Sequence, residues 1–178
     1  MKLRGQEVPA GCFVFETAIN KFLSNLHYRI TEEMWQRTNA LNLTFRQAMT
    51  VASMIEKEAA NDNERALIAS VIYNRLAAGM PLQFDSTIVY ARRETGDTTV
   101  TPEIIQATDS PYNTYLNNGL PPGPICNPGM KSIQAALNPA ETKYLYFALD
   151  VENEVIRFFT NFNEFEAFVA TQDYSGQG

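Results

Sequence analysis

The sequence predicts an α+β fold that is mainly helical and carries a small antiparallel β-sheet near its C-terminus. Apolar residues recur at helical spacing through most of the first 140 residues. Two runs of β-branched and aromatic residues follow, at 144–149 and 155–159, and the polar stretch between them predicts a hairpin. A length of 178 residues favours a single domain over 1–178 with a real hydrophobic core.

Three amphipathic helices are predicted in the first part of the chain. Residues 17–27 place their apolar side chains on one helical face. A second helix starts at Thr31 and runs to about Leu41. Thr44 is the predicted N-cap of the third helix, whose apolar stripe continues to Ala60.

A fourth helix is predicted after the third, with either Asn61 or Asp62 as its N-cap. This helix should end at Gly79, since glycine favours the left-handed conformation that follows a helix. Further short helices are predicted at 85–93, at 130–137 and, behind a capping box of Asn161 and Glu164, up to about Thr171.

Residues 111–128 form a proline-rich segment that should follow one defined irregular path, because proline fixes φ. Four residues at its start could bind sugars, since aromatic rings stack on sugar faces and amides and hydroxyls bind their polar groups. They are Tyr112, Asn113, Thr114 and Tyr115. The alternative is a rigid surface connection whose tyrosines pack inward.

Composition excludes several functions. The net charge of −6 leaves no basic stripe for nucleic acid. A single histidine, His27, and two separated cysteines, Cys12 and Cys126, disfavour a metal site or a histidine-based triad, and no cofactor is implied. No stretch reaches the ~20 apolar residues of a membrane span, so this chain is expected to be soluble.

The segment 52–60 places two carboxylates, Glu56 and Glu58, at the end of an apolar helix-forming run. An acid beside apolar surface holds its proton near neutral pH, which suits protonation of a departing glycosidic oxygen. The ordinary alternative is a pair of solvated acids at a helix end.

Ordered sequence blocks then resemble the catalytic domain of the YceG-like family of endolytic murein transglycosylases. The blocks lie within about 31–165 and read ASMIEKE from Ala52, YNRL from Tyr73, LQ at Leu82, DST from Asp85, YNTY from Tyr112, GLPPGPI from Gly119, NPG from Asn127 and NPA from Asn138. The resemblance leaves residues 1–30 as a divergent N-terminal part. It also implies that the family's membrane span and LysM-like domain are absent from this chain, which is expected to be a piece of a longer, membrane-anchored parent.

The resemblance implies cleavage of the bond between N-acetylmuramic acid and N-acetylglucosamine inside peptidoglycan strands, leaving 1,6-anhydro ends. Glu58 would be the general acid and then the base, without metal or cofactor. Peptidoglycan strands are the implied partner, cell-wall synthases are further candidates, and the parent would act on the extracytoplasmic face of a bacterial membrane. A hydrolytic muramidase and a non-catalytic peptidoglycan-binding scaffold remain alternatives.

Helical periodicity and the resemblance disagree about the acid. Residues two positions apart on a helix point in directions ~200° apart, so Glu56 and Glu58 face nearly opposite sides. Helical periodicity therefore predicts that Glu56 is buried in the apolar face and that Glu58 lies outside it. Alternatively Glu56 pairs with Arg65 or Arg75, and Glu58 points into the groove, as the resemblance favours. In addition, Gln83 is predicted to contact sugar or peptide.

Asp85 is predicted to be either a helix cap or a groove residue. Phe165 occupies the position where the family tends to carry a histidine in the last helix.

Overall fold

The computed structural model describes residues 28–174, together with 2–3, 6–7, 17, 20–21 and 24–25. The chain divides into two compact units, Met1–Gln36 and Arg37–Gly178.

The first unit contains a short antiparallel strand pair that the sequence did not predict. Its strands are β1 (Lys2–Leu3) and β2 (Gln6–Glu7). The described residues between 17 and 25 are helical, in agreement with the predicted helix at 17–27. The apolar stripe of that helix, His27 and Cys12 lie outside the described residues.

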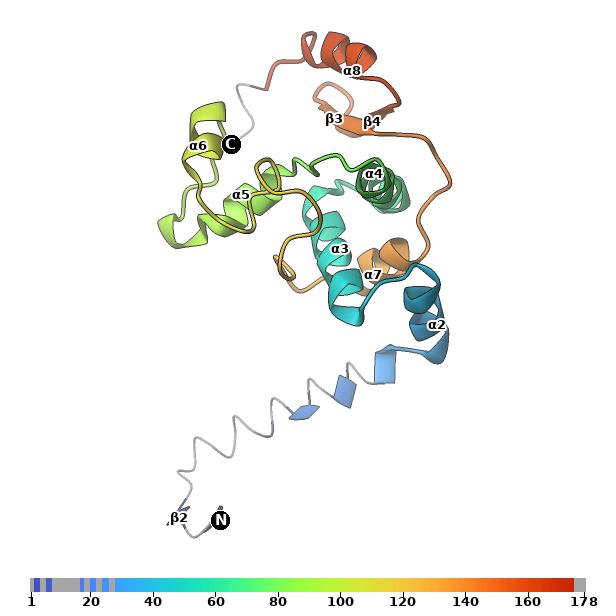
Figure 1. Ribbon diagram of the computed structural model, residues 1–178, viewed down its shortest axis with the longest axis vertical. Coiled ribbons are helices and arrows are strands. Elements are labelled where there is room, and N and C mark those ends of the chain that lie inside the picture. The colour runs from blue at the N-terminus through green and yellow to red at the C-terminus, as the bar shows by residue number, and fades with distance from the viewer. Residues whose placement is uncertain are drawn as a thin grey trace. The chain divides into compact units, whose positions relative to one another are not determined.

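The second unit is built around three helices, α3 (Phe45–Glu58), α4 (Arg65–Ala77) and α7 (Met130–Leu137), which pack on one another (Figure 1). Their facing side chains are almost completely buried; they include Val51, Met54, Ile55, Ile68, Ile72, Ile133 and Leu137. Each such side chain stabilises the fold by ~1.5–3 kcal/mol relative to exposure. The helical stripes read from the sequence therefore mark the true core.

The first helices begin and end close to where they were predicted. Helix α2 spans Glu32–Ala40. Thr44 caps α3 through a capping box, in which its hydroxyl accepts from the Gln47 N–H and the Gln47 side chain accepts from the Thr44 N–H. Gly79 follows α4 with a φ of 65°, which confirms its predicted role.

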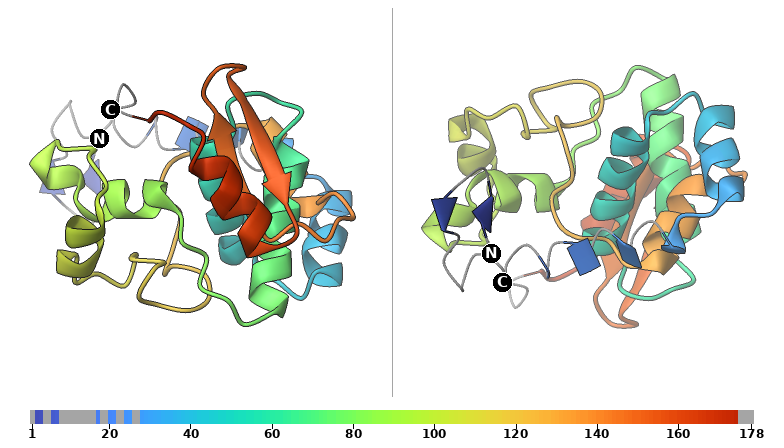
Figure 2. Two further views of the ribbon diagram at one scale, coloured as in Figure 1. Left: turned by 90° about the horizontal axis from the view of Figure 1, so that it is seen from above. Right: turned by 90° about the horizontal axis from the view of Figure 1, so that it is seen from below.

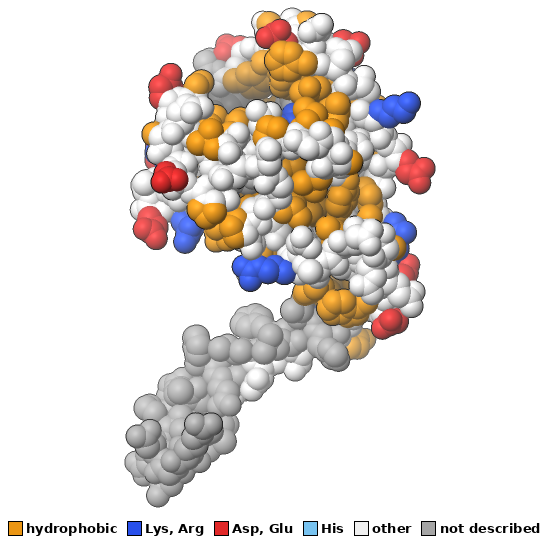
Figure 3. All heavy atoms as spheres, in the orientation of Figure 1, with side chains coloured by type: hydrophobic (Ala, Val, Ile, Leu, Met, Phe, Trp, Pro, Cys, Tyr) orange, Lys and Arg blue, Asp and Glu red, His pale blue; other side chains and the backbone are white. Residues whose placement is uncertain are grey.

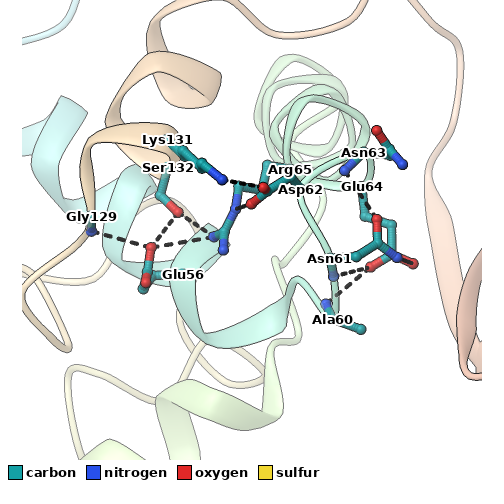
Figure 4. A network of polar contacts seen from close by, with 10 residues as sticks. All are labelled: Glu56, Ala60, Asn61, Asp62, Asn63, Glu64, Arg65, Gly129, Lys131 and Ser132. Atoms are coloured by element: carbon teal, nitrogen blue, oxygen red, sulfur yellow. Dashed lines mark hydrogen bonds and ion pairs between the residues drawn. The ribbon is translucent and has the colours of Figure 1, made fainter.

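The predicted N-cap of α4 was wrong. The helix is preceded by Glu64, and neither Asn61 nor Asp62 caps it. The reason is the buried Glu64 carboxylate, which accepts hydrogen bonds from the Ala60 and Asn61 amides and closes residues 60–64 into a turn (Figure 4). The same carboxylate accepts from the Ile156 N–H at 2.8 Å and so ties the turn to the C-terminal hairpin.

The predicted hairpin is confirmed as strands β3 (Tyr146–Asp150) and β4 (Val155–Phe159), paired antiparallel with Tyr146 opposite Phe159. Helix α8 (Phe162–Val169) follows and is capped by the Asn161 side chain. Helix and hairpin pack through aromatic rings. This layer lies at the top of the unit in Figure 1, and it is seen in front of the helices from above and behind them from below (Figure 2).

The segment between α4 and α7 contains α5 (Asp85–Ala91), the 3₁₀ turn η1 (Arg93–Thr95) and α6 (Pro102–Ala107). Helix α6 was not predicted. Its start carries a usable signal, because Thr101 caps it and Pro102 occupies the first turn, where proline is favoured.

The proline-rich segment then returns along α3 on a defined path, as expected. The Ile125 N–H donates to the Ser53 hydroxyl at 3.0 Å. A Cβ on Gly123 would lie 2.8 Å from Arg46 Nη2, so a larger residue there would require the Arg46 side chain to shift.

Apolar side chains are spread over the face shown in Figure 3, and acidic side chains lie around its margin. None of the described helices combines the length and apolar character needed to cross a bilayer.

Candidate active site

Glu56 lies in a polar network between α3 and α7 (Figure 4). Its Oε2 accepts from the Ser132 hydroxyl at 2.5 Å and from the Gly129 N–H at 3.2 Å, and it lies 3.3 Å from Arg65 Nη1. The Ser132 hydrogen bond, the Gly129 amide and Arg65 together hold the pKa of Glu56 below its usual value, against the effect of burial. Glu56 is therefore a charged residue that joins helices, and the alternative in which it pairs with Arg65 is confirmed.

Glu58 lies in a different environment. It is the last residue of α3, because the backbone becomes extended at Ala59. Its Oε1 is buried and has no hydrogen-bond partner. Burial raises the pKa of Glu58 to about 7, and the negative charge of Asp85 adds to the increase, whereas the nearby Ser86 hydroxyl and amide partly offset it. This carboxyl can hold or release a proton near neutral pH.

The prediction from helical periodicity was therefore wrong: it assigned the raised pKa to Glu56, whereas the carboxyl with the raised pKa is Glu58. The apolar face of α3 buries residues up to Ile55, but the cover over Glu58 comes from the start of α5, some 27 positions later in the chain. A helical pattern records only which face of its own helix is apolar. It cannot report a neighbour supplied by the tertiary fold.

Ser86 is a site residue that the sequence reasoning did not single out. Its Oγ is buried and, like Glu58 Oε1, has no hydrogen-bond partner. Unpaired buried polar atoms are costly and uncommon, so two of them beside each other mark a place where a bound group could supply the missing bonds. The only sequence signal was the position of Ser86 inside the block that begins at Asp85.

Asp85 does not cap α5, contrary to one of its two predicted roles. Phe84 is the N-cap, and Asp85 is the first helical residue. The Asp85 carboxylate accepts a hydrogen bond from the Tyr115 hydroxyl, and its charge, after burial, raises the pKa of that phenol. The carboxylate stands beside Glu58, as the groove alternative requires.

Three cavities open around this pair, and Glu58 and Asp85 line all of them. The three cavities therefore adjoin one another at Glu58 and Asp85, and together they are called the groove. The first has a volume of about 690 Å³ and is lined further by Lys57, Ser86, Val89, Tyr90, Arg93, Asp97 and Ile125. The second and third, of about 400 and 460 Å³, are lined mainly by aromatic and aliphatic side chains, among them Tyr115, Tyr146, Phe147, Phe165, Leu149 and Ile156.

Gln83 lines the second cavity, as its predicted role requires. Its φ of 58° is unusual for a residue with a side chain, and its N–H donates to the Thr114 carbonyl at 3.0 Å. Its Oε1 accepts from Arg75 at 3.2 Å. Arg75 also donates to the Leu145 carbonyl, so one guanidinium braces both the Gln83 turn and the approach to the hairpin.

The four residues of the YNTY block separate into different roles. Of these, Tyr115 alone lines a described cavity around Glu58. Asn113 and Thr114 are completely buried. The Asn113 amide donates to the Ile105 and Thr108 carbonyls, and the Thr114 hydroxyl accepts from the Phe84 N–H, so these side chains hold the loop and do not face the groove.

Tyr112 packs its ring on Tyr90, which lines the first cavity, with centroids 4.8 Å apart. Across the described residues, no group of three or more His, Cys, Asp and Glu side chains is arranged to hold a metal ion.

The chain is similar in sequence to several proteins that carry the same name. Endolytic murein transglycosylase of Bacillus subtilis (strain 168) is 44% identical over 138 residues, covering 71% of this chain and 38% of that protein. The protein of the same name from Streptococcus pneumoniae serotype 2 (strain D39 / NCTC 7466) is 34% identical over 158 residues, covering 87% of this chain and 28% of that protein. The chain therefore spans well under half the length of these relatives.

A crystal structure of a YceG-like protein from Listeria monocytogenes matches the fold with a TM-score of 0.77 at 35% identity, covering 97% of this chain and 52% of that one. The model of the YceG-like family matches residues 13–171, which include Glu58, Asp85 and Ser86. The chain belongs to the YceG-like family.

Proposed function

We propose that this chain is the catalytic part of an endolytic peptidoglycan transglycosylase. The observation that carries the proposal is a single carboxyl, Glu58, with a pKa of about 7 at the point where the three cavities meet. Two relatives that bear the name endolytic murein transglycosylase support the same activity. A groove that continues on both sides of the acid suits a polymer cut within its length.

In the proposed reaction, protonated Glu58 donates its proton to the glycosidic oxygen between N-acetylmuramic acid and N-acetylglucosamine as that bond breaks. Glu58, now a carboxylate, then removes the proton from the C6 hydroxyl of the muramic acid, and the C6 oxygen bonds to the anomeric carbon. The products are a 1,6-anhydro end and a strand with a free hydroxyl. The carboxyl regains its proton, so no water is consumed.

The groove supports a scheme with one protein acid. Asp85 is the nearest second carboxylate, and it is already engaged by the Tyr115 hydroxyl. Glycosidases that use two carboxylates need the second one as nucleophile or base. The substrate's own acetamido group can fill that role by assisting at the anomeric carbon.

We propose substrate contacts from Gln83, Asp85 and Tyr115, which line the groove. Tyr112 would support the groove wall through Tyr90. We further propose that the full-length protein is anchored in a bacterial membrane, acts on its extracytoplasmic face, and works beside cell-wall synthases.

Product analysis tests this function directly. Glycan strands incubated with the purified chain should yield muropeptides with 1,6-anhydro ends when measured by mass spectrometry. Reducing ends in their place would identify a hydrolytic muramidase. Strand binding without any product would identify a peptidoglycan-binding scaffold.

A further inference from the structure

The first cavity differs chemically from the other two. Lys57 and Arg93 line it together with the apolar side chains of Val89 and Ile125. The second and third cavities present mostly aromatic and aliphatic surface, and their one basic residue is Arg75. Because Arg75 is buried and donates to the carbonyls of Leu145, Pro81 and Leu82, its charge is used inside the fold.

Lys57 and Arg93 form no ion pair among the described residues, although the charge of Lys57 acts on nearby Glu56. The ion pairs of the described chain are Arg65–Glu56, Arg65–Asp62, Arg92–Asp97, Lys131–Asp62 and Arg157–Asp150. Both cations line the same cavity, in a chain with a net charge of −6. They could therefore receive an anion from outside the protein.

The acids that share this cavity do not neutralise the two cations directly. Asp97 is paired with Arg92 at 2.9 Å, and a hydrogen bond from the Thr99 amide further holds its pKa down to about 2. Asp85 is bonded to Tyr115. Glu58 is the proton donor of the proposed reaction, so it is uncharged when substrate binds.

The Arg93 guanidinium is held in place by its neighbour. Its carbon lies 4.6 Å from the centre of the Tyr90 ring, and its Nη1 donates to the Tyr90 carbonyl at 3.2 Å. Tyr90 in turn packs on Tyr112. An arginine fixed in this way loses less side-chain entropy when its remaining N–H groups bind a carboxylate.

We propose that the first cavity binds a carboxylate carried by the muramic acid side chain of the strand, through Lys57 and Arg93. This proposal rests on the proposed function, because it takes peptidoglycan as the ligand. The carboxylate has two chemical sources: the acidic groups of a stem peptide, or the free lactyl carboxylate of muramic acid from which the peptide has been removed. N-acetylglucosamine carries neither, so the cavity would fix which sugar lies on the Lys57 side of the scissile bond.

The test compares three oligosaccharides of equal length by their dissociation constants: one bearing stem peptides, one stripped to the lactyl carboxylate, and a neutral N-acetylglucosamine oligomer. Binding is measured by calorimetry in the Glu58→Gln background, which prevents turnover. The test variant adds Lys57→Gln and Arg93→Gln. The matched control adds Lys143→Gln, because Lys143 lines a separate cavity with Pro139 and Thr142.

The double substitution should weaken binding of at least one anionic oligosaccharide by roughly 2- to 20-fold, the range expected for two partly exposed ion pairs. The effect should shrink as salt is raised and should be smaller for the neutral oligomer. Loss confined to the peptide-bearing ligand would assign the stem peptide, and loss confined to the stripped ligand would assign the lactyl group. Loss on both would mean that either carboxylate is accepted.

Equal loss on the neutral oligomer, or no loss on either anionic ligand, would overturn the proposal. If the neutral oligomer binds and the wild-type chain releases anhydro products while the charge effect is missing, only this inference fails. If none of the three ligands binds and no product forms, the proposed function itself fails.

Discussion

Glu56 and Glu58 stand two residues apart at the end of α3, and their carboxyl groups have opposite electrostatic environments. Glu56 is ion-paired with Arg65 and its pKa is lowered, whereas the Glu58 carboxyl is buried and its pKa is raised to about 7. One helix end therefore carries a charged carboxylate that joins helices and a second carboxyl that can hold a proton near neutral pH. The two acids form a matched pair for mutagenesis.

Replacing Glu58 with glutamine should abolish turnover without unfolding the protein. The amide keeps the shape of the side chain but can neither give nor take the proton, so the rate should fall by at least ~10²–10⁴-fold. Release of anhydro-muropeptides and the melting temperature should be measured together. Normal release from this variant would remove Glu58 from the mechanism.

Replacing Glu56 with glutamine should reduce stability more than turnover. Arg65 loses one of its two carboxylate partners, and Ser132 and Gly129 lose an ionised acceptor, at a cost of about 1–2 kcal/mol at pH 7. Because the folded-state pKa of Glu56 is lowered, its stabilising effect is present above the unfolded value of 4.5 and is lost as pH falls through the folded pKa. Urea denaturation at pH 7 and pH 3 checks this, and a variant equally destabilised at both would contradict the ion-pair role.

The pH–rate profile should fall on its alkaline side near pH 7, because kcat/KM requires protonated Glu58. Asp85→Asn removes the like charge that raises this pKa, so the fall should move to lower pH by on the order of 1 pH unit. Ser86→Ala removes a hydroxyl that lowers the pKa, so the fall should move to higher pH. Shifts in the same direction would show that these neighbours do not act through Glu58.

Stability should also depend on pH through Glu58. Between the unfolded value of about 4.5 and the folded value of about 7, the folded state binds more protons than the unfolded state, so this residue makes stability fall as pH rises. The Glu58→Gln variant lacks this pH dependence. Its free energy of unfolding relative to that of the wild type should therefore rise by about 1–3 kcal/mol between pH 5 and pH 8. Thermal melts at both pH values measure the difference, and parallel curves would refute the raised pKa.

Two tyrosines of the proline-rich segment should separate binding from stability. Tyr115 lines the groove and bonds Asp85, so Tyr115→Ala should weaken glycan binding by ~1–3 kcal/mol, by analogy with stacked bases. Tyr112 packs on Tyr90 outside the groove, so Tyr112→Ala should chiefly lower the melting temperature. Binding isotherms and melts of both variants decide, and a large loss of stability with unchanged binding in Tyr115→Ala would make that residue structural.

The sequence by itself determined most of the helices, the C-terminal hairpin and most of their boundaries, but not α6. Helical stripes, the Thr44 capping box, the Gly79 turn and the hairpin are local patterns, and each is found where the pattern predicts it. The N-cap of α4 was misplaced because the Glu64 carboxylate organises the turn before it, accepting from the Ala60 and Asn61 amides and also from the Ile156 N–H, 92 residues away. No local pattern contains that partner.

The family and the identity of the candidate acid were also within reach of the sequence, but only through ordered motifs. Periodicity pointed to Glu56, and only the tertiary structure covers Glu58 with Asp85 and Ser86 and engages Glu56 with Arg65. It also separates Tyr115, which reaches the groove, from the buried Asn113 beside it. A pKa depends on every charge and apolar surface within a few ångströms, and contacts between distant parts of the chain decide which of them are present.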